Sequence, residues 1–177
     1  MKDQKKNNKG FSLVELIVVV AIMAVLLGVL VPTLVRNVEK SKKQKDINNL
    51  SELRSAIQTT MASEEFSGLT GTISFSGKTF DIKTTGTNAT LSSATLFTGE
   101  GTTEDAFWTE VLANLNGGAN YKFTYSSKLK DGDPEVTFVL QNEKVVGNVK
   151  VKDGKYKDEN GGVFNLQDAA QSSTVAP

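Results

Sequence analysis

An uninterrupted apolar run near the start of the chain constrains its fold more than any other feature. Nearly every side chain between residues 11 and 35 is apolar. As a helix, the run would be about 37 Å long, which exceeds the roughly 30 Å hydrocarbon core of a bilayer. The rest of the 177-residue chain is rich in Thr, Ser, Gly and Asn. The sequence therefore predicts one membrane-compatible helix over residues 11–35, followed by one polar domain.

A short basic segment precedes the apolar run. Residues 1–10 carry four lysines and one aspartate, as the basic region of a secretory signal does. No small-residue cleavage site follows the run, and the dipeptide Lys9-Gly10 comes before it. We therefore predict that residues 1–10 are a leader, removed by a cut after Gly10 that leaves the helix on the protein. Basic residues also follow the run, so charge counting alone leaves its orientation open.

Glu15 is the ionisable residue within the apolar run. An ionisable side chain in a membrane helix is costly and by default suggests a function. Cleavage before Phe11 would create a free α-amine four residues away, and the same amine on an axially shifted neighbour would match the Glu15 carboxylate. The alternative interpretation is a plain membrane anchor whose acid snorkels to the interface.

Pro32 and Gly28 lie deep in the same helix. Proline removes a backbone donor and clashes with the preceding turn, and glycine weakens the helix one turn earlier. The pair predicts a kink or a local opening near Pro32. A proline simply tolerated in a membrane helix is an equally open interpretation.

The chain resembles type IV pilins and the related pseudopilins through the prepilin-like segment Lys9-Gly10-Phe11-Ser12-Leu13-Val14-Glu15-Leu16-Ile17. The resemblance extends to about residue 32. It implies that a membrane peptidase cuts after Gly10 and methylates the new amine of Phe11. It also implies that Glu15 is the assembly glutamate and that the helix loosens before Pro32 in a packed filament. Many similar pilins carry a glycine where this chain has Ala24, which leaves the upstream limit of that loosened stretch open.

Beyond Pro32 the apolar residues acquire a helical period. They recur mainly at steps of three or four, at Val38, Ile47, Leu50, Leu53, Ile57 and Met61. This pattern predicts an amphipathic helix over residues 36–63 that continues the apolar helix and packs on the head. The same stretch carries cations that lie on a solvated face or contact headgroups or a neighbouring subunit, namely Lys40, Lys42, Lys43 and Lys45.

Residues 64–177 are predicted to form a globular head with an antiparallel sheet. Alternating patterns predict a hairpin from 72–75 and 79–83, a loop over 84–93, meander strands at 121–126, 135–140 and 144–151, and an edge strand at 155–157. A short helix is predicted from Glu104 to Leu115, with a cap at Thr102 or Thr103 and Trp108 in the core. The predicted fold class is α+β, a long N-terminal helix packed on an antiparallel sheet, as in pilins.

Absent residue types narrow the chemistry. The chain has no His and no Cys, which removes the commonest general base, nucleophile and soft metal ligands. Its 20 basic and 20 acidic residues balance, so nucleic acid is not expected as the main partner. Acidic turns suggest calcium at Asp131 and Asp133, with Asp153, Asp158 and Glu159 further on. Because no EF-hand-like loop is present, we assign no metal and no cofactor.

The resemblance to pilins implies a structural protein, and the absence of His and Cys makes an enzyme less expected. The expected function is a subunit that polymerises through its N-terminal helix into a type IV pilus, a surface filament for adhesion, motility or biofilm formation. The alternative is a pseudopilin of a type II secretion or DNA-uptake (competence) system. A membrane-anchored enzyme or receptor is the rival from another class, and no convergent acid pair supports it.

The expected partners follow from this function. They are other copies of the chain, a prepilin peptidase that also methylates, the inner-membrane pilus assembly machinery, and the membrane before assembly. The expected location is the cytoplasmic membrane first and an extracellular filament afterwards. Contacts between subunits would be heterologous, which builds open helices and not closed dimers.

Overall fold

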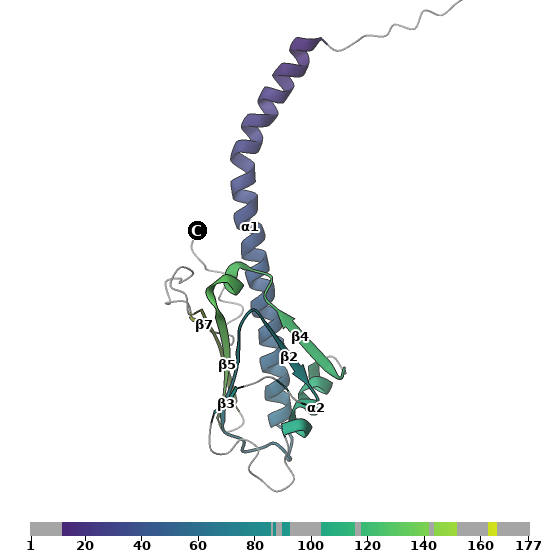
Figure 1. Cartoon of the computed structure of the whole chain (residues 1–177), viewed down its shortest axis with the longest axis vertical. Coiled ribbons are helices and arrows are strands. Elements are labelled where there is room, and N and C mark those ends of the chain that lie inside the picture. The colour runs from purple at the N-terminus through teal and green to yellow at the C-terminus, as the bar shows by residue number, and fades with distance from the viewer. Residues whose placement is uncertain are drawn as a thin grey trace, which may run out of the picture. The chain divides into compact units, whose positions relative to one another are not determined.

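The structure is a computed structural model that describes residues 12–85, 87, 90–92, 104–115, 118–141, 144–151 and 163–165. Its contacts divide the chain into two units, with the boundary between Val38 and Glu39. We call residues 12–38 the N-terminal segment and residues 39–177 the head. The helices are α1 (Leu13–Met61), α2 (Glu104–Leu115) and the short 3-10 helix η1 (Lys128–Gly132). The strands are β1 (Gly71–Ser76), β2 (Thr79–Lys83), β3 (Thr90–Ser92), β4 (Asn120–Thr124), β5 (Pro134–Gln141), β6 (Lys144–Val151) and β7 (Val163–Asn165) (Figure 1).

Helix α1 spans 49 residues and belongs to both units. The prediction of one continuous helix is confirmed, and its end at Met61 lies two residues before the predicted one. The helix also runs unbroken through Pro32, so the predicted local opening is not present in this structure. Proline removes only one of the many backbone hydrogen bonds of this 49-residue helix. The continuous turns on both sides therefore keep the helix closed.

The head contains two antiparallel sheets around one hydrophobic core. The larger sheet has the strand order β3-β1-β5-β6-β7, and the smaller one pairs β2 with β4. The helical stripe of α1 is buried in this core at Ile47, Leu50, Leu53, Ile57 and Met61. Helix α2 lies beside β2 and adds Phe107, Trp108, Val111 and Leu112 to the same core (Figure 1). The α+β fold class is thus confirmed: a long N-terminal helix followed by an antiparallel sheet.

The predicted hairpin between β1 and β2 is wrong, although both strands exist. β1 pairs with β3 and β5, whereas β2 pairs with β4. Gly77, at φ 97°, turns the chain out of one sheet toward the other, and its amide donates to the Pro134 carbonyl at 2.9 Å. The rings of Phe75 and Phe80 stack at 4.4 Å across this turn. An alternating pattern fixes which face of a strand is buried but does not choose its partner.

Some of the other predictions for the head are confirmed and others are wrong. The limits of α2, the burial of Trp108 and the paired strands β5 and β6 are confirmed. β4 pairs with β2, so it is not part of a meander with β5, and β3 lies inside the stretch predicted as a loop. The predicted strand at 155–157 and the cap at Thr102 or Thr103 lie outside the described residues.

Candidate functional site

The N-terminal segment combines an apolar composition with full exposure. Every residue from 12 to 38 is exposed, and the side chains of Leu13, Val25 and Val29 each keep more than 70% of their surface accessible. By length and composition, α1 is able to cross a membrane. Exposed apolar surface of this extent is unfavourable in water and marks a surface that lipid or another apolar helix covers.

Glu15 has a hydrogen-bond partner within its own chain. The backbone N–H of Ser12 donates to Oε2 of Glu15 at 2.9 Å, and the Leu16 N–H donates to the Ser12 carbonyl at 3.2 Å. This is half of a capping box, in which an acid in the first turn satisfies a free amide at the helix start. The negative charge also lies at the favourable end of the helix dipole.

This capping role of Ser12 was missed by the sequence reasoning above, although the Ser-x-x-Glu spacing is readable in the printed sequence. Of the other predicted site residues of this region, the structure describes only Pro32. Gly10 and Phe11 lie outside the described residues, and Pro32 follows Glu15 by nearly five turns along the exposed helix. The structure therefore describes the surroundings of Glu15 and Pro32 but not those of the predicted cleavage site.

Two carboxylates of α1 hold a loop of the head. Asp46 is 1% exposed and accepts hydrogen bonds from the Ser126 amide at 3.0 and 3.1 Å, the Ser126 hydroxyl at 2.7 Å and the Ser127 amide at 2.9 Å. Glu39, two turns earlier, accepts from the Lys128 amide. Because a charged acceptor on several amides is a strong arrangement, this pair fixes the start of η1 against α1.

Two tyrosines near α1 have raised pKa values. Burial raises the pKa of the Tyr125 hydroxyl far above its usual 10.0, and the nearby Asp46 carboxylate raises it further. The Tyr121 pKa rises to about 12, mainly through burial and secondly through Glu52. The Tyr125 hydroxyl is buried without a hydrogen-bond partner among the residues that the structure describes. Both groups are neutral at physiological pH, so neither supplies a charge to a site.

Helix α1 also completes the hydrogen bonds of a strand. Gln58 Oε1 accepts from the Val145 amide at 2.8 Å, and Arg54 donates to the Val145 carbonyl at 3.2 Å. Among the described residues, β7 pairs with β6 from Asn148 to Lys150, and Val145 lies outside these pairs. Two side chains one turn apart on α1 thus take the place of a neighbouring strand.

The acidic residues considered for calcium do not form a site in the described part of the chain. Asp131 lies in η1 and Asp133 follows it in a left-handed conformation at φ 51°. Asp153, Asp158 and Glu159 lie outside the described residues. No group of three or more Asp or Glu placed to hold a metal ion occurs within the described ranges.

Three features together indicate the class of this protein. The first half of α1 is apolar and exposed, an acid lies at the start of that helix, and the second half of the helix packs in the core of an α+β head. The N-terminus matches the family described as the prokaryotic N-terminal methylation motif, over residues 5–31. That range includes Gly10, Phe11 and Glu15 and ends just before Pro32. The chain thus has the N-terminal motif of a type IV pilin-like protein.

The relatives that match are secretion proteins. Type II secretion system core protein G of Aeromonas hydrophila is 37% identical over 54 residues, covering 30% of this chain and 38% of that protein. The protein of the same name from Dickeya chrysanthemi is 38% identical over 53 residues, covering 30% and 35%. That of Pectobacterium carotovorum subsp. carotovorum is 41% identical over 49 residues, covering 28% and 31%. The chain therefore spans well under half the length of these curated relatives. No solved structure matches it.

Proposed function

We propose that this chain is a filament-forming subunit of the type IV pilin-like class, assembled through its N-terminal helix. The observation that carries the proposal is the methylation motif placed directly on the first half of α1, where the apolar residues are exposed. Such a helix is covered by lipid before assembly and by the same helix of other subunits afterwards. In a filament with these helices at its axis, the apolar surface is buried from water while the helix stays part of the protein. The chain then acts as a structural protein.

We assign the filament to a pseudopilus of a type II secretion-like system. The support is that the matching relatives are named type II secretion system core protein G. The similarity covers 54 residues at most in these relatives, so most of the head lies outside it. A surface type IV pilus is the second candidate, because the large head with Thr- and Ser-rich stretches suits a fibre exterior.

Processing in this function uses the predicted site residues. Gly10 is the small residue before the cut, and Phe11 becomes the methylated first residue. The new amine of one subunit is the charge partner of Glu15 on another, replacing the Ser12 amide that caps it within one chain. Pro32 is the place where the helix loosens during packing. The proposed partners are the processing peptidase, other copies of the chain and the inner-membrane assembly machinery.

The two filaments are separated by deleting the gene in the producing organism and measuring both secretion and sheared surface material. Loss of secreted proteins with unchanged surface filaments supports the pseudopilus. Loss of surface filaments that an antibody against the head labels supports the pilus. N-terminal sequencing of the exported protein tests the class itself, because an intact Met1 start would contradict both candidates.

A further inference from the structure

Several lysines lie on the first turns of α1 that belong to the head. Lys40, Lys42 and Lys45 are exposed there, within seven residues of the boundary at Val38. The segment is covalently continuous with a stretch that is able to cross a membrane. At about 1.5 Å per residue, Lys40 and Lys42 follow Val38 by about 3 and 6 Å along the helix. Connectivity alone therefore brings them to the lipid headgroup layer when that stretch lies in a bilayer.

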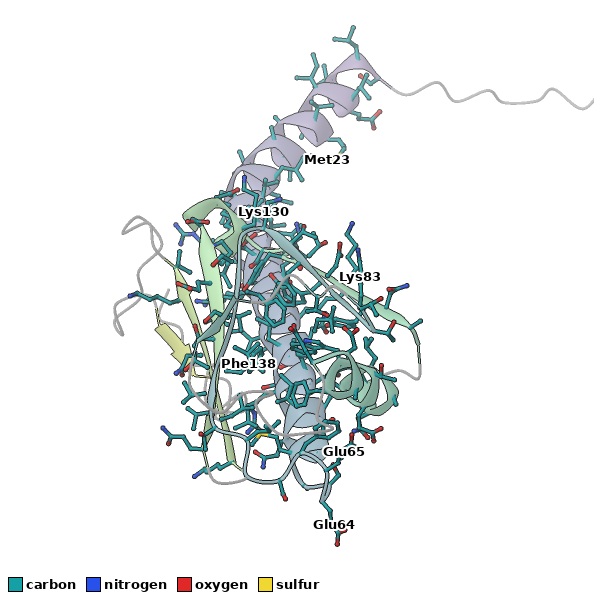
Figure 2. All side chains as sticks on the ribbon, turned by 60° about the horizontal axis from the view of Figure 1, so that its bottom comes forward. Met23, Glu64, Glu65, Lys83, Lys130 and Phe138 are labelled. Atoms are coloured by element: carbon teal, nitrogen blue, oxygen red, sulfur yellow. The ribbon has the colours of Figure 1, made fainter. Side chains whose placement is uncertain are left out.

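A second element, distant in sequence, adds cations to the same place. The Ser126 hydroxyl donates to the Lys42 carbonyl at 3.5 Å, and the Lys128 amide donates to Glu39. Lys128 and Lys130 themselves are exposed. Figure 2 shows Lys130 at the opposite end of the head from Glu64 and Glu65. We call Lys40, Lys42, Lys45, Lys128 and Lys130 the basic surface.

The acids around the basic surface are largely engaged within the head. Glu39 and Asp46 accept hydrogen bonds from the amides of residues 126–128. Asp133 and Glu135 also have partners of their own. Asp131 is the exposed acid of η1 itself. The carboxylates of Glu39 and Asp46 are thus directed at backbone amides, whereas the lysines of the basic surface are exposed to solvent.

We propose that the basic surface binds the phosphates of anionic lipid headgroups while the subunit is held in the membrane. Lysine suits this contact, because its apolar stem lies along a surface while its ammonium reaches the phosphate. The contact orients the head on the bilayer through η1 as well as through α1. The proposal rests on the membrane-held state in the proposed function and adds the chemistry of the lipid to it. An acidic surface of a second copy is the competing occupant.

The test uses the full chain reconstituted into vesicles of phosphatidylcholine, with or without about 30% phosphatidylglycerol. The chain has no cysteine, so Thr124→Cys on β4 gives a single position for a fluorescent donor. A headgroup-labelled lipid serves as the energy-transfer acceptor. The same donor at Ser67→Cys, which directly follows the buried Phe66 near the end of the head that holds Glu64, is the positional control. Flotation of the vesicles measures insertion separately from head contact.

Phosphatidylglycerol is expected to raise transfer from position 124, and about 0.5 M salt to remove the increase. Replacing Lys128 and Lys130 together by glutamine should weaken the association of head and lipid about 25-fold, at about five-fold per lysine. The matched pair Lys83→Gln and Lys122→Gln, on β2 and β4, should leave the response unchanged.

Equal transfer with and without phosphatidylglycerol in vesicles that contain the protein would overturn the proposal. So would an equal loss in the control pair. A response that follows the density of protein in the vesicle instead of lipid charge would assign the basic surface to a second copy. Failure of the chain to float with vesicles would instead contradict the membrane-held state, and with it the proposed function.

Discussion

At the scale of single residues, Asp46 is the buried carboxylate among the polar contacts that join α1 to the loop before η1. Its carboxylate receives the amides of Ser126 and Ser127 and the Ser126 hydroxyl in a fully buried position. A buried carboxylate is costly unless such donors surround it, and the donors are equally costly without it. The free energy of this contact therefore depends on both sides being present.

Asp46→Ala should lower the free energy of unfolding by about 2–4 kcal/mol, because it leaves buried amides without an acceptor. Urea unfolding of the full chain in detergent, followed by the fluorescence of the buried Trp108, measures the change. Asn48→Ala, at an exposed position of the same helix, is the control and should cost much less. An equal loss in both variants would show that the cost arises from the helix and not from the loop.

Alkaline pH should destabilise the head through its buried tyrosines. The native state keeps the Tyr121 proton up to about pH 12 and that of Tyr125 higher still, while tyrosines of an unfolded chain ionise near 10.0. This stability is therefore complete below pH 10 and is lost as the pH rises above it. Tyr125→Phe should be neutral or stabilising at pH 7, because the hydroxyl has no partner in the described structure, and should flatten the alkaline loss. Unfolding midpoints between pH 8 and about 11 provide the measurement.

Gly10→Val should block removal of the leader, because a branched side chain replaces the small residue before the proposed cut. The mass of the protein in membranes reports the outcome, and the precursor mass is expected. Asn8→Val, in the same leader, should be processed normally. A normal mature mass for Gly10→Val would remove Gly10 from the recognition site.

At the scale of elements, the sequence predicts local structure well and strand partners poorly. α2 and β6 begin and end where predicted, since turn residues and apolar periods are encoded next to each element. The partners of β1 are β3 and β5, and in the second pair Gly71 lies opposite Leu140, far along the chain. Nothing in the local alternation of β1 distinguishes that partner from the adjacent β2. For the candidate site, the motif around Glu15 was readable, but the contacts of Asp46, Glu39 and Arg54 depend on tertiary structure.

Gln58→Ala tests whether α1 acts as a substitute neighbour for β6. The variant leaves the Val145 amide without its 2.8 Å acceptor, so its hydrogen exchange should accelerate by about ten-fold, equivalent to a loss of about 1.4 kcal/mol. Amide exchange followed by mass spectrometry or NMR measures it. Thr59→Ala, at the next and exposed position of α1, is the control. Unchanged protection at Val145 would show that the strand does not depend on the helix.

At the scale of the whole molecule, one helix serves two environments. Its first half has apolar residues on all sides and is exposed, and its second half buries a single stripe in the head. The first half therefore determines what the subunit joins, whereas the second determines how the head is held. The methylation motif lies on the first, exposed half.

Glu15→Ala should leave the protein processed and its head folded but reduce filament yield strongly, because the proposed charge partner of the new amine is removed. Sheared or overproduced filaments, quantified with an antibody against the head, measure assembly. Ser12→Ala keeps the backbone amide that caps Glu15 and is the matched control. Normal filaments from cells that contain only Glu15→Ala would refute the assembly role.

The pairing of β1 with β5 has a consequence for the order of events during synthesis. Chains grow from the N-terminus, so α1 leaves the ribosome long before Leu140 exists to pair with Gly71. The larger sheet of the head cannot form its central pair, β1 with β5, until then. In the proposed function, the apolar half of α1 therefore enters the bilayer first. The head then folds while it is tethered to the membrane, so β1 and β5 pair next to the membrane surface.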